Sequence, residues 1–311
     1  MLRGIVALLV CLYHLTEGFF PDGHLLRFIF SRGYLGVEIF FVISGFVIPY
    51  TMFKSQYQYK DAGTFMLRRL ARIEPPYWCS IALIFLTEYI STFFRFYKDK
   101  VIDFSWKDLF YHIFHLNDFL EKPWLRGIYW SLAIEVQFYL LMAIIFPFLI
   151  FKNKKVSYAL LLVFCLARWI NWNHTVFYYG CHFVIGILLF NAFIEKINIK
   201  ELCCGLLISF GLTYWCFDLY HLSAVVFGVL FIYHFDYFIK PLVFLGKISY
   251  SFYLIHIQIG WLVLDALLRE YPQGNKIEFL IYSVVAAILG SYFFYLIVEK
   301  PSHRLARSIG K

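Results

Sequence analysis

Charged residues are scarce in this chain. Only 15% of its 311 residues are charged, whereas 61% are hydrophobic and the mean hydropathy is +0.69. An average soluble domain has about 25% charged residues, so this composition excludes an ordinary soluble protein. It predicts an all-α, polytopic transmembrane helical bundle.

Other features are absent as well. The sequence has no repeat of fixed period, no low-complexity tract and no linker long enough to separate domains, so we expect one integral-membrane domain over residues 1–311 with an outer loop at 97–127. The seven cysteines lie in or beside apolar runs without metal-ligand spacing, which predicts free thiols and no metal. The net charge of +8 has no basic, aromatic-interleaved soluble surface to carry it, so we expect membrane lipids around the protein and no nucleic acid.

Ten apolar runs predict about ten membrane spans, at roughly 3–20, 33–53, 77–97, 128–151, 156–172, 176–194, 202–217, 219–236, 245–267 and 277–298. The first run lacks a small-residue cleavage site, so we expect a retained helix rather than a signal peptide. With both termini in the cytoplasm, 17 of the 28 Lys and Arg residues fall on the cytoplasmic side. This is the orientation that the positive-inside rule favours. In the second run, Ser44 and Gly45 predict a close helix approach or a kink.

Several ionisable side chains lie inside these runs. Arg3 and His14 are eleven residues apart, so they point to nearly the same helix face, roughly 16 Å apart along the axis. With the predicted topology, His14, Glu38 and Glu135 share a depth roughly 8–10 Å below the outer surface. Such residues are costly in hydrocarbon and usually functional. We therefore expect a buried site in which either Glu38 or Glu135 orients His14 and raises its basicity. His182, in the sixth run, could lie at the same depth but is by itself better explained as structural.

A basic cluster lies between the second and third runs. Arg68 and Arg72 are one helical turn apart with Arg69 adjacent, and we expect Pro75 and Pro76 to end this helical run. Guanidinium groups bind phosphate oxygens bidentately, although the positive-inside rule alone also produces such clusters. Arg3 lies at the same membrane face. A ligand with a phosphate handle and a distant reactive end would fit, and coenzyme A thioesters have this shape.

Six segments in order resemble acyltransferase family 3: LRGIVALLVCLYHL, GYLGVEIFFVISGFVI, FMLRRLARIEPPYW, WSLAIEVQFYL, LGKISYSFYLIHIQI and the terminal VEKP. The resemblance extends from residue 3 to about residue 303. It implies an integral-membrane enzyme, in the bacterial inner membrane, that moves acyl groups, commonly acetyl, onto sugars of surface polysaccharides and other acceptors.

The resemblance also implies roles for individual positions. They are Arg3 and the catalytic His14 for the Arg-x10-His pair, Glu38 for the acid before FFVISGF, Arg69 and Arg72 for the paired arginines, Trp130 and Glu135 for the WSL-acid motif, Ser249, Tyr250, Tyr253 and His256 for the late SY-x-x-Y-x-x-H pattern, and Glu299 and Pro301 for the final acid-x-Pro. The chain departs from the family in three places. It begins almost at Arg3, Glu74 replaces a more usual aromatic or apolar residue, and Val136 replaces a frequent second acid. A soluble hydrolase-like domain, carried by some relatives, has no counterpart, so we expect direct transfer or a partner.

These observations predict an O-acyltransferase with a funnel open to the cytoplasm. The phosphates of acyl-CoA, in the first instance acetyl-CoA, bind Arg3, Arg68, Arg69 and Arg72. His14 acts as general base on a hydroxyl of a glycan or lipid-linked sugar, or as the nucleophile, and Trp130, Tyr253 and His256 lie on the acceptor side. A glycan or lipid transporter would also bury charges, but it would show inverted repeats with broken helices. A third possible function is that of a non-catalytic scaffold for polysaccharide assembly.

Overall fold

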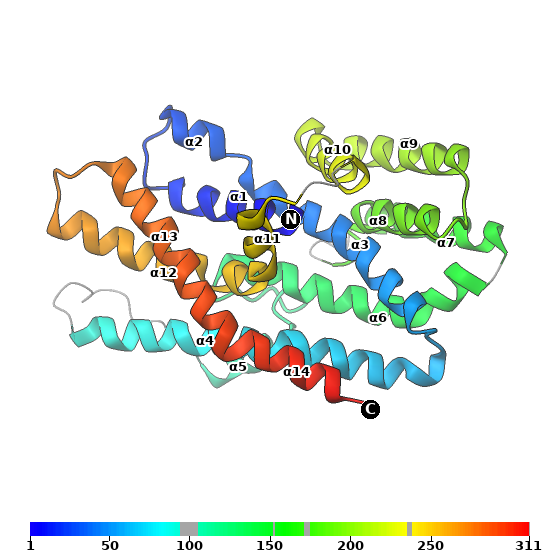
Figure 1. Cartoon of the computed structure of the whole chain (residues 1–311), viewed down its shortest axis with the longest axis horizontal. Helices are drawn as coiled ribbons and strands as arrows, with labels where there is room; N and C mark the ends of the chain where they lie inside the picture. Colours follow the sequence, from blue (N-terminus) through cyan, green and yellow to red (C-terminus); the bar gives the residue numbers. More distant parts are fainter. Residues whose placement is uncertain (94–104, 152, 171–174, 235–237, 311) are drawn as a thin grey trace. The chain divides into compact units, whose positions relative to one another are not determined.

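The computed structural model describes residues 1–93, 105–151, 153–170, 175–234 and 238–310, in which every regular element is a helix (Figure 1). This confirms the all-α class. Residues 97–104 of the predicted outer loop lie outside the described residues. The helices form two compact units: unit 1 comprises Met1–Met66 and Ile134–Lys247, and unit 2 comprises Leu67–Ala133 and Ile248–Lys311. The division falls within helices α4 and α6.

Unit 1 joins the first 66 residues of the chain to residues 134–247. Its helices are α1 (Leu2–Thr16), α2 (Leu25–Phe30), α3 (Gly36–Lys54), most of α6 (Trp130–Phe151), α7 (Lys154–Leu166), α8 (Gly180–Phe193), α9 (Ile199–Cys216), α10 (Leu219–His234) and α11 (Lys240–Lys247), with short helices at Gly33–Leu35, Tyr59–Asp61 and Ala167–Ile170. Within this unit α1 packs against α11 and α3 packs against α8.

Unit 2 contains most of α4 (Ala62–Phe93), α5 (Trp106–Ile113), a short helix at Gly127–Tyr129, α12 (Ser249–Glu270), α13 (Lys276–Phe294), a π-helical turn at Tyr295–Glu299 and α14 (Lys300–Ser308). Helices α12 and α13 lie side by side, and α14 continues the direction of α13 (Figure 1, orange to red). Within the predicted outer loop, α5 is followed by His115, which adopts a positive φ of 53°.

Each of the ten predicted apolar runs contains a helix, but ten membrane spans are not confirmed. By length and composition, five described segments are long and apolar enough to cross a membrane: Leu25–Lys54, Gly127–Ile150, Ile199–Cys216, Ser249–Glu270 and Lys276–Ser308. Helices α1, α8 and α10 are apolar but shorter. These segments support an integral membrane protein.

The prediction that Pro75 and Pro76 end a helix is wrong, because α4 continues through both residues. Each proline removes the N–H that would bond to the carbonyl one turn earlier. The Tyr250 hydroxyl donates a hydrogen bond to the carbonyl of Ile73 at 2.7 Å, close to this break. Apolar helices tolerate proline where other groups satisfy the freed carbonyls. Here the freed carbonyls are those of Ala71 and Arg72, and the Tyr250 bond falls on the next one along the chain.

Small residues bring the helices of unit 1 close together, as Ser44 and Gly45 predicted. A Cβ at Gly45 would overlap the carbonyl of Phe183 in α8, and one at Gly186 would overlap the carbonyl of Val42 in α3. On the other side of α3, a Cβ at Gly36 would lie 2.8 Å from both Val6 and Val10 of α1. These contacts fix the register of α3 against its two neighbours.

Candidate functional site

The structure divides the predicted site residues between the two units. Unit 1 holds Arg3, His14, Glu38 and Glu135, and unit 2 holds Arg68, Arg69, Arg72, Trp130, Tyr253 and His256. Each group is described within its own unit.

His14 lies in the last turn of α1 and is partly buried. Its ring contacts that of Tyr13, with centroids 4.9 Å apart, and the Tyr13 ring meets the edge of Tyr34 at 5.5 Å. Tyr34 in turn contacts the ring of His221 at 6.3 Å. A continuous path of aromatic contacts therefore leads from His14 to His221.

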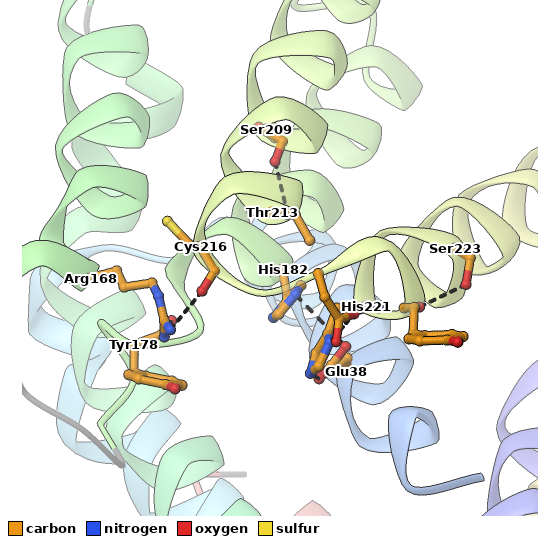
Figure 2. Close-up of polar contacts among 11 residues, drawn as sticks. Glu38, Arg168, Tyr178, His182, Ser209, Thr213, Cys216, His221 and Ser223 are labelled. Atoms are coloured by element: carbon orange, nitrogen blue, oxygen red, sulfur yellow. Dashed lines mark hydrogen bonds and ion pairs between the residues drawn. The ribbon is translucent and has the colours of Figure 1, made fainter. Parts of the chain in front are cut away.

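Glu38 is buried in the first turn of α3, where it contacts two histidines rather than His14 (Figure 2). Its Oε1 lies 3.1 Å from Nε2 of His221, and its Oε2 lies 4.0 Å from Nε2 of His182. The Gly36 contacts with α1, together with the Arg3 guanidinium 5.8 Å from the Phe40 ring, place Glu38 near the level of Val6. His14 is eight residues further along α1, roughly 12 Å at helical rise. The structure therefore does not place Glu38 and His14 at one depth.

Sequence analysis missed His221 and its neighbour Asp218. Asp218 accepts a hydrogen bond from the backbone N–H of His221 at 2.9 Å, and its Oδ1 lies 2.7 Å from Nδ1 of the same residue. Burial raises the pKa of Asp218, but the hydrogen bonds from His221 outweigh this effect, so the pKa lies below its ordinary value. The available signal was an Asp-x-x-His pattern at the break between two apolar runs.

His182 in α8 is completely buried, and neither of its ring nitrogens has a hydrogen-bond partner among the described residues. The Phe217 ring covers it at 4.9 Å and also contacts His221 at 5.1 Å. Arg168 also packs over the Phe217 ring, 4.0 Å from its centroid, and donates a hydrogen bond to the carbonyl of Cys216 at 2.8 Å (Figure 2).

Glu135 lies on α6 and is partly buried. Its Oε1 accepts a hydrogen bond of 2.5 Å from the Tyr139 hydroxyl one turn later on the same helix. Each of the two candidate acids thus has a partner of its own within unit 1.

In unit 2, Arg68 and Arg72 each donate one hydrogen bond from Nε to a residue near the C-terminus. The Nε of Arg68 donates to the carbonyl of Ile309 at 2.9 Å, and the Nε of Arg72 donates to Nε2 of His303 at 3.2 Å. Both bonds use Nε, so within the part of the chain that the structure describes the terminal amino groups of both guanidinium forks remain available to a phosphate. Arg69, between them, is partly buried.

The same network includes the final acid of the chain. Glu299 is 2% exposed, and its Oε1 lies 3.5 Å from Nε2 of His303. Its Oε2 accepts hydrogen bonds from the backbone N–H and the hydroxyl of Ser251 at 3.0 Å and 2.5 Å. The structure therefore joins three motifs of unit 2, namely the paired arginines, the late serine-tyrosine segment and the acid-x-Pro.

The predicted acceptor residues also form contacts within unit 2. The Tyr253 hydroxyl lies 2.8 Å from Oγ of Ser131 and donates to the carbonyl of Ile128 at 3.1 Å. This places Tyr253 beside the residue that follows Trp130. His256 is completely buried, and its Nδ1 lies 2.9 Å from the carbonyl oxygens of Phe252 and Tyr253.

Glu74, which departs from the family pattern, has a partner in the outer loop. It is buried, and its Oε1 lies 3.0 Å from Nε2 of His115. The Tyr77 ring stacks on His115 with centroids 5.0 Å apart. The segment after α5 is thus held against α4 by a buried polar pair.

Comparisons with known proteins agree with the motifs. Residues 1–296 match a family described as an acyltransferase domain. The chain is 31% identical over 179 residues to O-acetyltransferase OatA of Staphylococcus aureus strain COL, a match that covers 52% of this chain and 27% of the relative. It is 26% identical over 367 residues to a candidate O-acetyltransferase of the same strain, covering 96% of this chain and 56% of the relative.

The chain thus spans between about a quarter and about half of the length of these curated relatives. No solved structure matches the chain. The family match covers nearly all of the sequence, so the chain belongs to this family of membrane acyltransferases.

Proposed function

We propose that the protein is a membrane-embedded O-acyltransferase that moves an acyl group, in the first instance acetyl, from acyl-CoA to a hydroxyl of a glycan or glycolipid. The family match over residues 1–296, which includes the Arg3 and His14 pair, carries this proposal. The names of the two Staphylococcus relatives support O-acetylation. A transporter or flippase receives no support from these comparisons.

The donor phosphates bind the arginines. Arg68 and Arg72 each use Nε for an internal hydrogen bond, which orients the fork while leaving its amino groups for phosphate oxygens. Arg69 and Arg3 add positive charge on the cytoplasmic side in the proposed topology, with both termini in the cytoplasm of a bacterial inner membrane.

His14 acts as general base. It takes the proton of the acceptor hydroxyl while the oxygen attacks the thioester carbonyl, and the carbon–sulfur bond breaks to release CoA thiolate, which gains a proton. In the alternative route His14 attacks the thioester itself and forms an acyl-imidazole that the acceptor hydroxyl then cleaves. Trp130, Tyr253 and His256 contribute aromatic and polar surface for the sugar.

Radiolabelled acetyl-CoA and the purified protein in lipid nanodiscs test the donor site. We expect Arg69→Ala to lose binding and His14→Ala to retain it, with Arg27→Ala, a partly exposed arginine paired with Asp22, as the control. Mass spectrometry of surface glycans from a deletion strain that carries each variant tests transfer. We expect both Arg69→Ala and His14→Ala to abolish O-acylation. Normal O-acylation by His14→Ala would exclude the mechanism.

A further inference from the structure

An apolar groove lies in unit 1 between α7, α8 and α9, and it contains none of the residues that the proposed function uses. Helix α8 packs against both α7 and α9 (Figure 1, green to yellow-green). The groove has a volume of about 340 Å³, which lies within the range of roughly 300–1,000 Å³ for ligand pockets. Most of its lining is apolar and includes Leu161, Leu162, Val184, Leu188, Gly205 and Ile208.

The groove leads from the surface of unit 1 toward its interior. Leu162 and Ile208 in its lining are 46% and 50% exposed, whereas Val184 is 2% exposed. The side chains of Val163 and Leu207, next to the groove residues along α7 and α9, are also exposed and apolar. In an integral membrane protein an apolar surface of this kind faces lipid. The groove therefore suits a hydrocarbon chain.

One end of the groove is polar. Glu201 lines it from the first turn of α9, and its Oε2 lies 3.1 Å from Nζ of Lys154 in the first turn of α7. The same oxygen accepts a hydrogen bond from the backbone N–H of Asn198 at 2.7 Å. The charge of Glu201 is thus balanced by a lysine and by the start of its own helix. Helices α7 and α9 both begin at this end, and a helix N-terminus favours an anion.

The polar end also carries an excess of positive charge. Four lysines and two glutamates lie in the first turns of α7 and α9 or between α8 and α9, namely Lys154, Lys155, Lys196, Lys200, Glu195 and Glu201. Lys155 and Lys200 are exposed, and neither forms an ion pair with another described residue. Lys155 lies three residues before Tyr158, which lines the groove, so the two share one face of α7.

Charge and shape together identify the occupant. Basic pockets between membrane helices bind anionic lipid headgroups at the cytoplasmic face, which is where the proposed topology places this end. We propose that the groove binds an anionic phospholipid, with one acyl chain in the apolar part and the phosphate beside Lys155 and Lys200. A zwitterionic lipid offers the same chain, but its ammonium group opposes the attraction of these lysines. The inference does not depend on acyl transfer, so it stands or fails separately from the proposed function.

Native mass spectrometry of the purified protein in detergent micelles measures lipid binding. The probes are palmitoyl-oleoyl phosphatidylglycerol, which is anionic, and palmitoyl-oleoyl phosphatidylcholine, which has the same chains and a zwitterionic headgroup. We expect phosphatidylglycerol to bind with the lower Kd and to lose this advantage as the salt concentration rises, because salt screens exposed charges.

Lys155→Gln tests the headgroup contact. We expect the Kd of phosphatidylglycerol to rise about fivefold, the effect of about 1 kcal/mol per lysine near an anionic lipid surface, and the Kd of phosphatidylcholine to stay constant. Lys240→Gln is the matched control, because it removes an exposed lysine of α11 that lies outside the groove. That variant should bind both lipids as the wild type does.

Two adjacent cysteines test the chain contact. Both are exposed, but Cys204 lines the groove and Cys203 does not. Cys204→Phe places a ring in the groove and should raise the Kd of both lipids roughly tenfold, the effect of losing about two buried methylene groups. Cys203→Phe should bind normally. If Cys204→Phe fails to fold, Ile208→Trp and its control Leu207→Trp repeat the comparison, because Ile208 lines the groove and Leu207 does not.

Three results would overturn the anionic lipid site. The first is equal binding of the two lipids by the wild type, and the second is wild-type affinity for phosphatidylglycerol in Lys155→Gln. The third is equal binding by the groove variant and its control, which would show that the chain lies elsewhere. Displacement of phosphatidylglycerol by a lower concentration of a polyprenyl phosphate would identify a different occupant and would also overturn the proposal.

Discussion

The guanidinium of Arg72 donates from Nε to Nε2 of His303 at 3.2 Å. In this bond Nε2 is the acceptor. The same Nε2 lies 3.5 Å from the buried carboxylate of Glu299. An arginine that the proposed function assigns to the donor phosphates is therefore oriented by the last helix of the chain.

His303→Gln should weaken binding of the acyl donor indirectly, because His303 contacts Arg72 rather than the donor in the proposed site. The loss of one hydrogen bond to a charged group costs about 1.5 kcal/mol, which corresponds to roughly a tenfold increase in the Kd of acetyl-CoA. Equilibrium binding of radiolabelled acetyl-CoA in nanodiscs measures this change. His234→Gln, an exposed histidine in unit 1, should bind normally. Unchanged binding by His303→Gln would mean that the Arg72 contact does not orient the phosphate site.

Tyr253→Phe separates a structural role from an acceptor role. The variant loses the hydroxyl that contacts Ser131 and Ile128, so we expect about 1 kcal/mol of destabilisation. If the hydroxyl positions Trp130 for a sugar, the KM for the glycan acceptor rises while the Kd of acetyl-CoA stays constant. Tyr282→Phe, at an exposed tyrosine of α13, is the control. A stability loss with unchanged acceptor kinetics would assign Tyr253 to packing alone.

Hydropathy and motif spacing predicted much of the helix order but not the side-chain pairing. The apolar runs located ten helices because burial in lipid demands long apolar segments. The depth of Glu38 was predicted less well, because a short helix at Gly33–Leu35 delays the start of α3 and the register against α1 depends on glycine contacts. His221 and Asp218 escaped notice because they lie at the break between α9 and α10, which has no periodicity to mark it.

The prediction that the helix ends at Pro75 and Pro76 was wrong for a related reason. Proline rules derive mainly from helices in water, whereas apolar helices tolerate proline more readily, and α4 continues through Pro75 and Pro76. Glu74 was noted as a departure from the family, yet its partner His115 lies across a loop whose course the sequence does not reveal. Long-range pairs of this kind arise from packing and not from local pattern.

Gly186→Ala tests the contact between α3 and α8. The added Cβ would overlap the carbonyl of Val42, and both backbones would have to separate. We expect a loss of about 1–3 kcal/mol, the usual cost of overpacking, measured as a lower midpoint of thermal unfolding in nanodiscs. Gly211→Ala on α9 is the matched control, because a Cβ there meets no atom within 4 Å. That variant should unfold at or above the wild-type temperature, since alanine favours helix. Equal midpoints for Gly186→Ala and wild type would show that α3 and α8 are not in close contact.

The outer loop should loosen in acid because of His112. Burial lowers the pKa of His112 below its ordinary value of 6.5, and its Nε2 accepts a hydrogen bond from the backbone N–H of Leu125 at 3.0 Å. Protonation of Nε2 would remove that acceptor and bring two N–H groups together. The unfolded loop binds the proton more readily than the folded one, so folding stability falls as the pH drops below 6.5 and levels off below the folded-state pKa.

Hydrogen exchange at the Leu125 amide measures this effect directly. We expect its protection, corrected for the intrinsic pH dependence of exchange, to decrease as the pH falls from 7 toward 5. His112→Gln removes the titrating group, so its corrected protection should be lower at neutral pH and should no longer vary across this range. The Phe252 amide, which donates to the carbonyl of Ile248 in the buried start of α12, provides an internal reference. A corrected protection of Leu125 that stays constant in the wild type would show that His112 does not couple the loop to pH.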